Sequence, residues 1–217
     1  MRSSAWPTRS VTVLSSADRA DAPVACIRVS TYPQITDMSV ADSAIDGLRI
    51  ITLKQVTDER GTVREYYRQS SWLALGLPDL GPFLQLNLTE TKRGGVRGMH
   101  AEDIVKVVTV AAGSAFGAYV DLRPDSPTAG KVVTVDLRPG TQVLVPKGVG
   151  NGFQALEDAT QYLYGFSAEW VPGMAGKAVT PLDPALGLDW PLPIDTDDRA
   201  MLSVKDRDAP LLADVLS

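Results

Sequence analysis

Acid–base chemistry in this chain would centre on His100, the only histidine among 217 residues. It closes the segment Gly-Val-Arg-Gly-Met-His at positions 95–100, which also carries a cation, Arg97. Imidazole can take up and release a proton near neutral pH. A β-branched run from Ile104 to Val110 follows and predicts a strand that holds His100 beside a sheet. This context favours a catalytic histidine over a buried structural one.

The same residue counts argue against a transition-metal centre. Metal sites in barrel-like β proteins gather several histidines with a carboxylate, and structural zinc sites combine cysteine with histidine. One histidine and one cysteine, Cys26, cannot build either set. We therefore expect acid–base chemistry by protein side chains, with no metal and no cofactor.

A second candidate group lies in residues 83–89, which alternate along the chain. One face carries Phe83, Gln85, Asn87 and Thr89, and the other carries leucines at 84, 86 and 88. Alternation with period two is typical of a β-strand. The pattern predicts leucines packed against a second sheet and amides directed into a polar cavity. Amides that merely face solvent are an equal alternative from this stretch alone.

The elements that must position these residues have the texture of an all-β protein. Short apolar and β-branched runs recur between turns rich in Gly, Pro, Asp and Ser. A short helix is expected at 66–75 and another at 209–216. No βαβ rhythm and no Gly-rich phosphate loop is present. The predicted strands are 48–56, 83–89, a strand at His100, 105–110, 115–122, 131–137, 142–145 and 160–166.

Composition sets the broad class. With 44% hydrophobic and 22% charged residues, the chain is ordinary for a globular protein. Residues 1–37 are rich in small and polar residues without a period and are expected to be a loosely ordered extension, so 38–217 form a single domain. A net charge of −5 argues against nucleic acid. No apolar run is long enough to span a membrane, and one cysteine suits a reducing cytoplasm.

Motifs spread in order from about residue 45 to the C-terminus resemble the dTDP-4-dehydrorhamnose 3,5-epimerase family. That family is a metal-free branch of the cupin-like jelly rolls. The resemblance implies a cupin-like jelly-roll barrel or sandwich with short helices and a C-terminal covering segment. The matching segments are DERG at 58–61, QLN at 85–87, GVRGMH at 95–100, VDLR at 120–123, SPT at 126–128, VPKGV at 145–149, LY at 163–164, DP at 183–184, LGLDWP at 186–191 and LSVKD at 202–206.

The resemblance also implies an activity and the residues that perform it. Members of the family invert carbons next to the 4-keto group of a nucleotide-linked 6-deoxy sugar. His100 matches the base and Asp206 the carboxylate that orients it. Tyr164 matches the acid that returns a proton on the opposite face. Lys106 resembles the lysine that stabilises the enolate oxygen, although the segment between His100 and Lys106 is shorter than in typical members.

Substrate binding is implied for a further set of residues. Two arginines are candidates for the diphosphate, because a guanidinium binds phosphate with two parallel hydrogen bonds. The chain departs from the family twice, with an asparagine in place of a second histidine and a tryptophan near a position commonly held by tyrosine. A homodimer is also implied, in which Arg60 would act on the partner's site. The candidate binding residues are Arg60, Gln85, Asn87, Arg97, Asn151 and Trp170.

Three functional interpretations remain open from the sequence. The leading one is an epimerase that inverts C3, C5 or both in a dTDP-linked 4-keto-6-deoxy sugar. Inversion of a single carbon, or use of another nucleotide, is a variant of it. A jelly roll that binds a sugar nucleotide without catalysis is the second class, and an acid–base pair on two faces argues against it. A metal-dependent cupin oxygenase is disfavoured because the metal ligands are missing.

Overall fold

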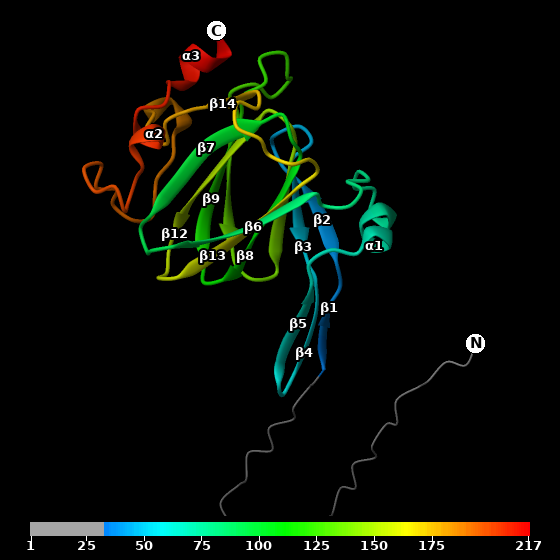
Figure 1. The fold of residues 1–217 in the computed structure, drawn as a ribbon. Coiled ribbons are helices and arrows are strands. Elements are labelled where there is room, and N and C mark those ends of the chain that lie inside the picture. The colour runs from blue at the N-terminus through cyan, green and yellow to red at the C-terminus, as the bar shows by residue number, and fades with distance from the viewer. Residues whose placement is uncertain (1–32) are drawn as a thin grey trace, which may run out of the picture. The chain divides into compact units, whose positions relative to one another are not determined.

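The computed structural model describes residues 33–217 as two large antiparallel sheets and one small sheet (Figure 1). Residues 1–32 of the predicted extension lie outside the described residues, and its residues Gln34–Thr36 form strand β1. The five-stranded sheet has the order β10-β9-β12-β7-β14, and the six-stranded sheet has the order β2-β3-β11-β8-β13-β6. Their strands are β2 (Ser39–Asp42), β3 (Arg49–Thr52), β6 (Gln85–Thr91), β7 (Val96–Glu102), β8 (Lys106–Ala112), β9 (Ala115–Asp121), β10 (Val132–Leu137), β11 (Thr141–Val145), β12 (Val149–Ala155), β13 (Thr160–Phe166) and β14 (Gly176–Ala178).

The main hydrophobic core lies between the inner faces of the two large sheets. Val108 and Val143 from the six-stranded sheet and Tyr119 from the five-stranded sheet are fully buried in it. Phe153 of β12 stacks on Tyr162 of β13 with ring centroids 4.0 Å apart, which joins the two sheets directly. The predicted all-β jelly roll is confirmed.

A three-stranded sheet and one helix extend the six-stranded sheet. The small sheet has the order β1-β4-β5, and β4 (Lys54–Asp58) and β5 (Gly61–Glu65) form a hairpin that projects away from the large sheets (Figure 1). Helix α1 (Gln69–Ala74) lies within the predicted helix 66–75. Its Trp72 is fully buried in a second apolar cluster, with residues of β3, β8 and β11, on the outer face of the six-stranded sheet.

The C-terminal segment covers the outer face of the five-stranded sheet. It contains a 3-10 helix, η1 (Pro184–Leu186), and the short helices α2 (Val204–Arg207) and α3 (Leu212–Leu216) (Figure 1). Leu186 and Leu212 pack with Met99, Ala118 and other residues of β7 and β9 in a third apolar cluster. The covering segment implied by the family resemblance is therefore present. None of the helices within residues 33–217 is long and apolar enough to cross a membrane.

The sheets differ from the sequence prediction in several details. The predicted strand 48–56 is divided at Leu53 into β3 and β4, which belong to different sheets. The predicted leucine face does not pack against a second sheet, because β6 is an edge strand and this face is open. Leu84, which precedes β6, and Leu86 and Leu88 within it are 55%, 62% and 55% exposed. Strand β12 was not predicted, since glycines at 150 and 152 interrupt its apolar pattern. The glycine at 152 is needed for close packing, because a Cβ there would lie 2.8 Å from the backbone oxygen of Arg97 on β7. A Cβ on Gly98 of β7 would lie 2.4 Å from the Cα of Gly152.

Candidate active site

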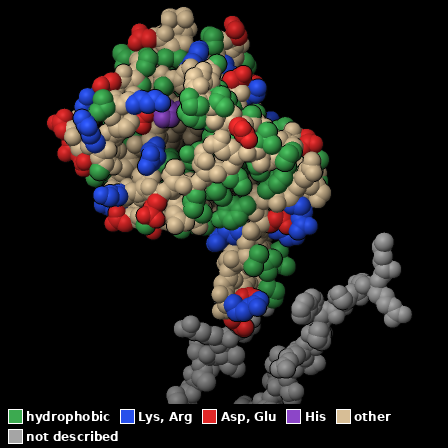
Figure 2. All heavy atoms as spheres, in the orientation of Figure 1, with side chains coloured by type: hydrophobic (Ala, Val, Ile, Leu, Met, Phe, Trp, Pro, Cys, Tyr) green, Lys and Arg blue, Asp and Glu red, His purple; other side chains and the backbone are tan. Residues whose placement is uncertain are grey.

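A cavity of about 760 Å³ opens between the two large sheets. Figure 2 shows it as a hollow with the imidazole in its wall and Lys and Arg side chains around its mouth. Strands β7 and β12 line it from one sheet, and β6, β8 and β13 line it from the other. Residues 170–178 and 199–206 complete the wall. The cavity therefore receives side chains from two opposing surfaces and from the C-terminal segment.

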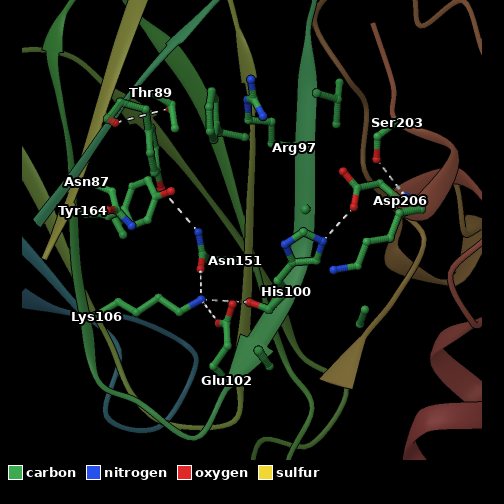
Figure 3. A pocket seen from close by; sticks show the side chains of 18 of the residues that line it. Asn87, Thr89, Arg97, His100, Glu102, Lys106, Asn151, Tyr164, Ser203 and Asp206 are labelled. Carbon is green, nitrogen blue, oxygen red and sulfur yellow. Dashed lines mark hydrogen bonds and ion pairs between the residues drawn. The ribbon is translucent and has the colours of Figure 1, made fainter. Parts of the chain in front are cut away.

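His100 is held by Asp206, which comes from 106 residues further along the chain. The C-terminal segment reaches β7 through a bridge between Val96 and Leu202, and the next residue, Ser203, caps helix α2 by accepting a hydrogen bond from the backbone N–H of Asp206. Nε2 of His100 lies 2.7 Å from Oδ1 of Asp206. With that nitrogen donating to the carboxylate, Nδ1 is left as the proton acceptor. Figure 3 shows this second nitrogen directed into the cavity.

Asp206 is suited to stay ionised beside the histidine. Its residue is 5% exposed, and burial alone would raise the pKa of the carboxyl group. The hydrogen bond from His100, the charge of the imidazolium and the hydrogen bonds from Ser203 and Gly98 outweigh burial and lower the pKa. A carboxylate in this place fixes the tautomer of His100 and stabilises its cation.

Lys106 lies in the same cavity with its ammonium group enclosed by protein acceptors. It begins β8 and is 4% exposed. Its Nζ donates to Oδ1 of Asn151 at 2.7 Å and to the backbone oxygen of His100 at 3.2 Å, and it pairs with the carboxylate of Glu102 (Figure 3). Burial lowers the pKa of Lys106, and the charge and hydrogen bond of Glu102 oppose that effect. The cavity thus contains a fixed cation within contact of the histidine's own backbone.

Asn151 links Lys106 to the aromatic core. It lies opposite His100 in the pairing of β12 with β7, just before a shift of register. Its amide oxygen accepts from Lys106, and its Nδ2 lies 3.5 Å from the hydroxyl of Tyr162. Burial raises the pKa of Tyr162, so this hydroxyl stays neutral. Asn151 therefore orients Lys106. The sequence predicted Lys106 in the site but not the residues that hold it.

Tyr164 faces the histidine from the other sheet. It lies on β13 opposite Asn87 of β6, and both side chains line the cavity (Figure 3). Gln85 donates to Oδ1 of Asn87 at 3.3 Å and accepts from the backbone N–H of Trp170 at 2.8 Å. Trp170 itself is 45% exposed on the rim. The polar face of β6 thus points into the cavity, as its alternation predicted.

Four cations line the cavity in addition to Lys106. Arg97, which sequence reasoning selected, donates to Thr91 through Nε at 3.2 Å. The other three were not selected: Lys177 on β14, and Arg199 and Lys205 on the C-terminal segment. Lys205 lies next to Asp206 in the family motif LSVKD at 202–206, so its position in the sequence could have indicated that it lines the site. Arg97, Arg199 and Lys205 make the wall suitable for an anionic group such as a diphosphate. The ammonium group of Lys177 instead donates to the backbone oxygens of Leu122 and Val215.

The sequence profile of the dTDP-4-dehydrorhamnose 3,5-epimerase family matches residues 42–214. The chain belongs to this family. The dTDP-4-dehydrorhamnose 3-epimerase of Streptomyces niveus is 35% identical over 82% of this chain and 85% of that protein. The dTDP-4-dehydrorhamnose 3,5-epimerase of Salmonella typhimurium is 33% identical over 82% of this chain and 98% of that protein. The crystal structure of NovW, a 4-keto-6-deoxy sugar epimerase from Streptomyces spheroides, superposes with a TM-score of 0.75 at 35% identity, over 84% of this chain and 91% of that chain.

Nine of the ten candidate residues line the epimerase cavity, and Arg60 does not. Arg60 lies at the turn between β4 and β5, where its side chain is 90% exposed and pairs with Asp58 at 2.6 Å. The hairpin carries it away from the large sheets (Figure 1). Within one chain, Arg60 therefore takes no part in this cavity. Its action on a partner's site stays a prediction.

Glu102 is a further side chain of the cavity wall that sequence reasoning did not select. It was noted only as part of a short segment between His100 and Lys106. In the structure it ends β7, lines the cavity and contacts the ammonium group of Lys106. A carboxylate two residues after the histidine was a possible signal, because side chains at i and i+2 of a strand share a face.

Proposed function

We propose that the chain epimerises a dTDP-linked 4-keto-6-deoxy sugar at C3, C5 or both, as part of deoxysugar biosynthesis. The observation that carries this proposal is the placement of an acid–base pair on opposing sheets. His100, held by Asp206, lies on β7, and Tyr164 lies on β13 across the cavity. A sugar bound between them presents one face to each residue. Removal of a proton on one face and delivery on the other inverts the carbon.

The steps follow from the groups in the cavity. A hydrogen on a carbon next to a ketone is acidic because its removal gives an enolate. Nδ1 of His100 takes that proton, and Asp206 stabilises the resulting imidazolium. Lys106 supplies the fixed positive charge for the enolate oxygen. Tyr164 then protonates the carbon from the opposite side, which completes the inversion.

Substrate binding is assigned by chemistry to two parts of the wall. The cations Arg97, Arg199 and Lys205 suit the diphosphate, since guanidinium and ammonium groups bind phosphate oxygens strongly. The amides of Gln85 and Asn87 suit hydroxyl or base groups, and Trp170 offers an aromatic surface on the rim. Asn151 contributes by holding Lys106.

The test is solvent deuterium incorporation into dTDP-4-keto-6-deoxyglucose in D2O, followed by mass spectrometry and proton NMR. Two deuterons, at C3 and C5, identify a 3,5-epimerase, and one identifies an epimerase of a single carbon. The similarity to both a 3-epimerase and a 3,5-epimerase makes this count decisive. No exchange with this sugar or with other nucleotide carriers would refute the proposal and favour a binding module without catalysis.

We further propose a cytoplasmic homodimer in which Arg60 reaches the partner's cavity. Support comes from the exposed hairpin tip and from the open leucine face of β6. Mixing two inactive variants, Arg60→Ala and His100→Ala, tests this arrangement. Mixed dimers would regain one intact site, so activity should reappear after exchange of subunits. No recovery, or a monomer in light scattering, would contradict the dimer. Cell fractionation tests the location.

A further inference from the structure

We propose that Glu102 is a positioning residue for the epimerase reaction, which fixes the ammonium group of Lys106 in place and in its charged form. The inference rests on the proposed function, in which that ammonium faces the enolate oxygen. Glu102 acts through Lys106 and needs no contact with the sugar. Nothing in the sequence motifs of the family resemblance assigns it this role.

The first support is the way the chain brings the two side chains together. Glu102 is the last residue of β7, in the five-stranded sheet, and Lys106 is the first residue of β8, in the six-stranded sheet. The short connection 103–105 turns both side chains into the same cavity. Their side chains are only 18% and 5% exposed, and they form a direct ion pair (Figure 3). A buried pair of this kind is costly to separate, because each partner would be left as an unpaired buried charge.

The second support is the complete set of acceptors around the ammonium. An ammonium group has three N–H donors. Here they meet the carboxylate of Glu102, Oδ1 of Asn151 at 2.7 Å and the backbone oxygen of His100 at 3.2 Å. The longest of these contacts is the one to His100. Turning that N–H toward a substrate oxygen would keep Glu102 and Asn151 as two fixed supports.

The third support is charge. Among the titratable groups that line the cavity with Lys106, His100 and Glu102 come from β7, and Tyr162 and Tyr164 come from β13. The residue of β13 that pairs with Lys106 is Phe166, which is apolar. Asn151 from β12, which accepts from Lys106, is neutral. Val145, which pairs with Lys106 across β11 and β8, is apolar. The carboxylate of Asp206 also lines the cavity but accepts from His100.

Burial lowers the pKa of Lys106, and Glu102 raises it. Without the carboxylate, the ammonium would therefore lose its proton at a lower pH. A neutral amine stabilises an enolate poorly, because the charge that opposes the developing anion is gone.

The experiment compares Glu102→Gln with the wild type and with a matched control, Asp103→Asn. Asp103 is the next residue, and its side chain is 68% exposed in a surface pair with Lys147. The pH dependence of kcat and KM is measured, and Lys106 is titrated by NMR of labelled lysine side chains. In Glu102→Gln, both the alkaline limb of kcat and the Lys106 titration should move to lower pH. A shift of one pH unit lowers kcat about tenfold on that limb.

KM should stay within about threefold, because the sugar is not held by Glu102. Asp103→Asn should keep the wild-type profile, and Glu102→Asp should restore the position of the alkaline limb. An alkaline limb and a Lys106 titration that are unchanged in Glu102→Gln would overturn the inference. Uniform loss of kcat at every pH would do the same, since it indicates a structural role only.

The design separates this inference from the proposed function. If the wild-type protein neither exchanges nor epimerises the sugar, the proposed function fails, while the NMR titration still tests the coupling of Lys106 to Glu102. If Glu102→Gln does not fold in thermal unfolding, the wild-type titration decides. A Lys106 signal that shows no inflection in the range where carboxylates titrate would then overturn the inference.

Discussion

Replacing Asp206 by Asn keeps the shape of the side chain and removes the charge that supports His100. In the wild type, Nε2 of His100 lies 2.7 Å from Oδ1 of Asp206, and Asp206 is 5% exposed. An asparagine can donate its own N–H to Nε2 of His100. The proton of the imidazole would then move to Nδ1, which is the nitrogen that must act as the base. The substitution thus affects both the tautomer and the stability of the imidazolium.

The size of the effect follows from these two losses. A hydrogen bond to a charged group contributes about 1.5 to 3 kcal/mol, which corresponds to about 10- to 150-fold in rate. The wrong tautomer removes the base function itself, and a positioned base contributes about 10²- to 10⁴-fold. We therefore expect Asp206→Asn to lower kcat by about 10²- to 10⁴-fold. KM should change little, because the carboxylate faces the histidine.

The assay is epimerisation of dTDP-4-keto-6-deoxyglucose followed by proton NMR, with circular dichroism as a check on folding. Ser203→Ala is a suitable comparison, since it removes the cap of α2 but leaves the carboxylate in place. Its kcat should fall far less than that of Asp206→Asn. A folded Asp206→Asn variant with kcat within threefold of the wild type would refute the role assigned to the pair.

Three further predictions follow from other parts of the structure. Tyr164→Phe should lower the rate of formation of the inverted sugar by about 10²- to 10⁴-fold, while deuterium exchange through His100 continues. Proton NMR of the recovered sugar measures both, and inverted sugar formed at the wild-type rate would contradict the role of Tyr164. Burial would raise the pKa of Asp121, but hydrogen bonds from Arg123, Ser126 and Thr128 lower it to about 2. Because this folded-state pKa lies below the ordinary aspartate value of 3.8, the stabilisation that the Asp121 carboxylate contributes is present above pH 3.8 and is lost as the pH falls toward 2. Acid unfolding should therefore show Asp121→Asn to be on the order of 2 kcal/mol less stable than the wild type at neutral pH, with the gap closing in acid. Gly98→Ala should lower the free energy of unfolding, measured in urea, by at least about 2 kcal/mol, because its Cβ would lie 2.4 Å from the Cα of Gly152. Gly187→Ala, whose Cβ would meet open space, should lower it by about 1 kcal/mol.

The sequence was sufficient for the fold class and for nine of the residues that line the cavity. Alternation in β6 placed Gln85 and Asn87 on one face, and the family motifs placed His100, Asp206 and Tyr164 in one site. Alternation alone could not show which face is covered. In β6 the polar face is the inner one, so the leucines on the other face remain open at the sheet edge.

Other features depend on contacts that no local pattern contains. Strand β12 was missed because Gly150 and Gly152 lack the side chains that signal a strand, although the close approach to β7 requires a glycine at 152. The pairing of Glu102 with Lys106 arises from a turn between two sheets, so the helical i, i+4 rule does not predict it. Arg199 and Lys205 reach the wall only because the C-terminal segment folds over the five-stranded sheet.

The most direct test of the mechanism compares His100→Ala with the wild type in D2O. Exchange at the carbons next to the ketone is measured by mass spectrometry, and binding of the nucleotide sugar is measured by calorimetry. The expected result is loss of exchange by at least about 10²-fold with binding that stays within a few-fold of the wild type. Exchange in the variant as fast as in the wild type would contradict the assignment of His100 as the base.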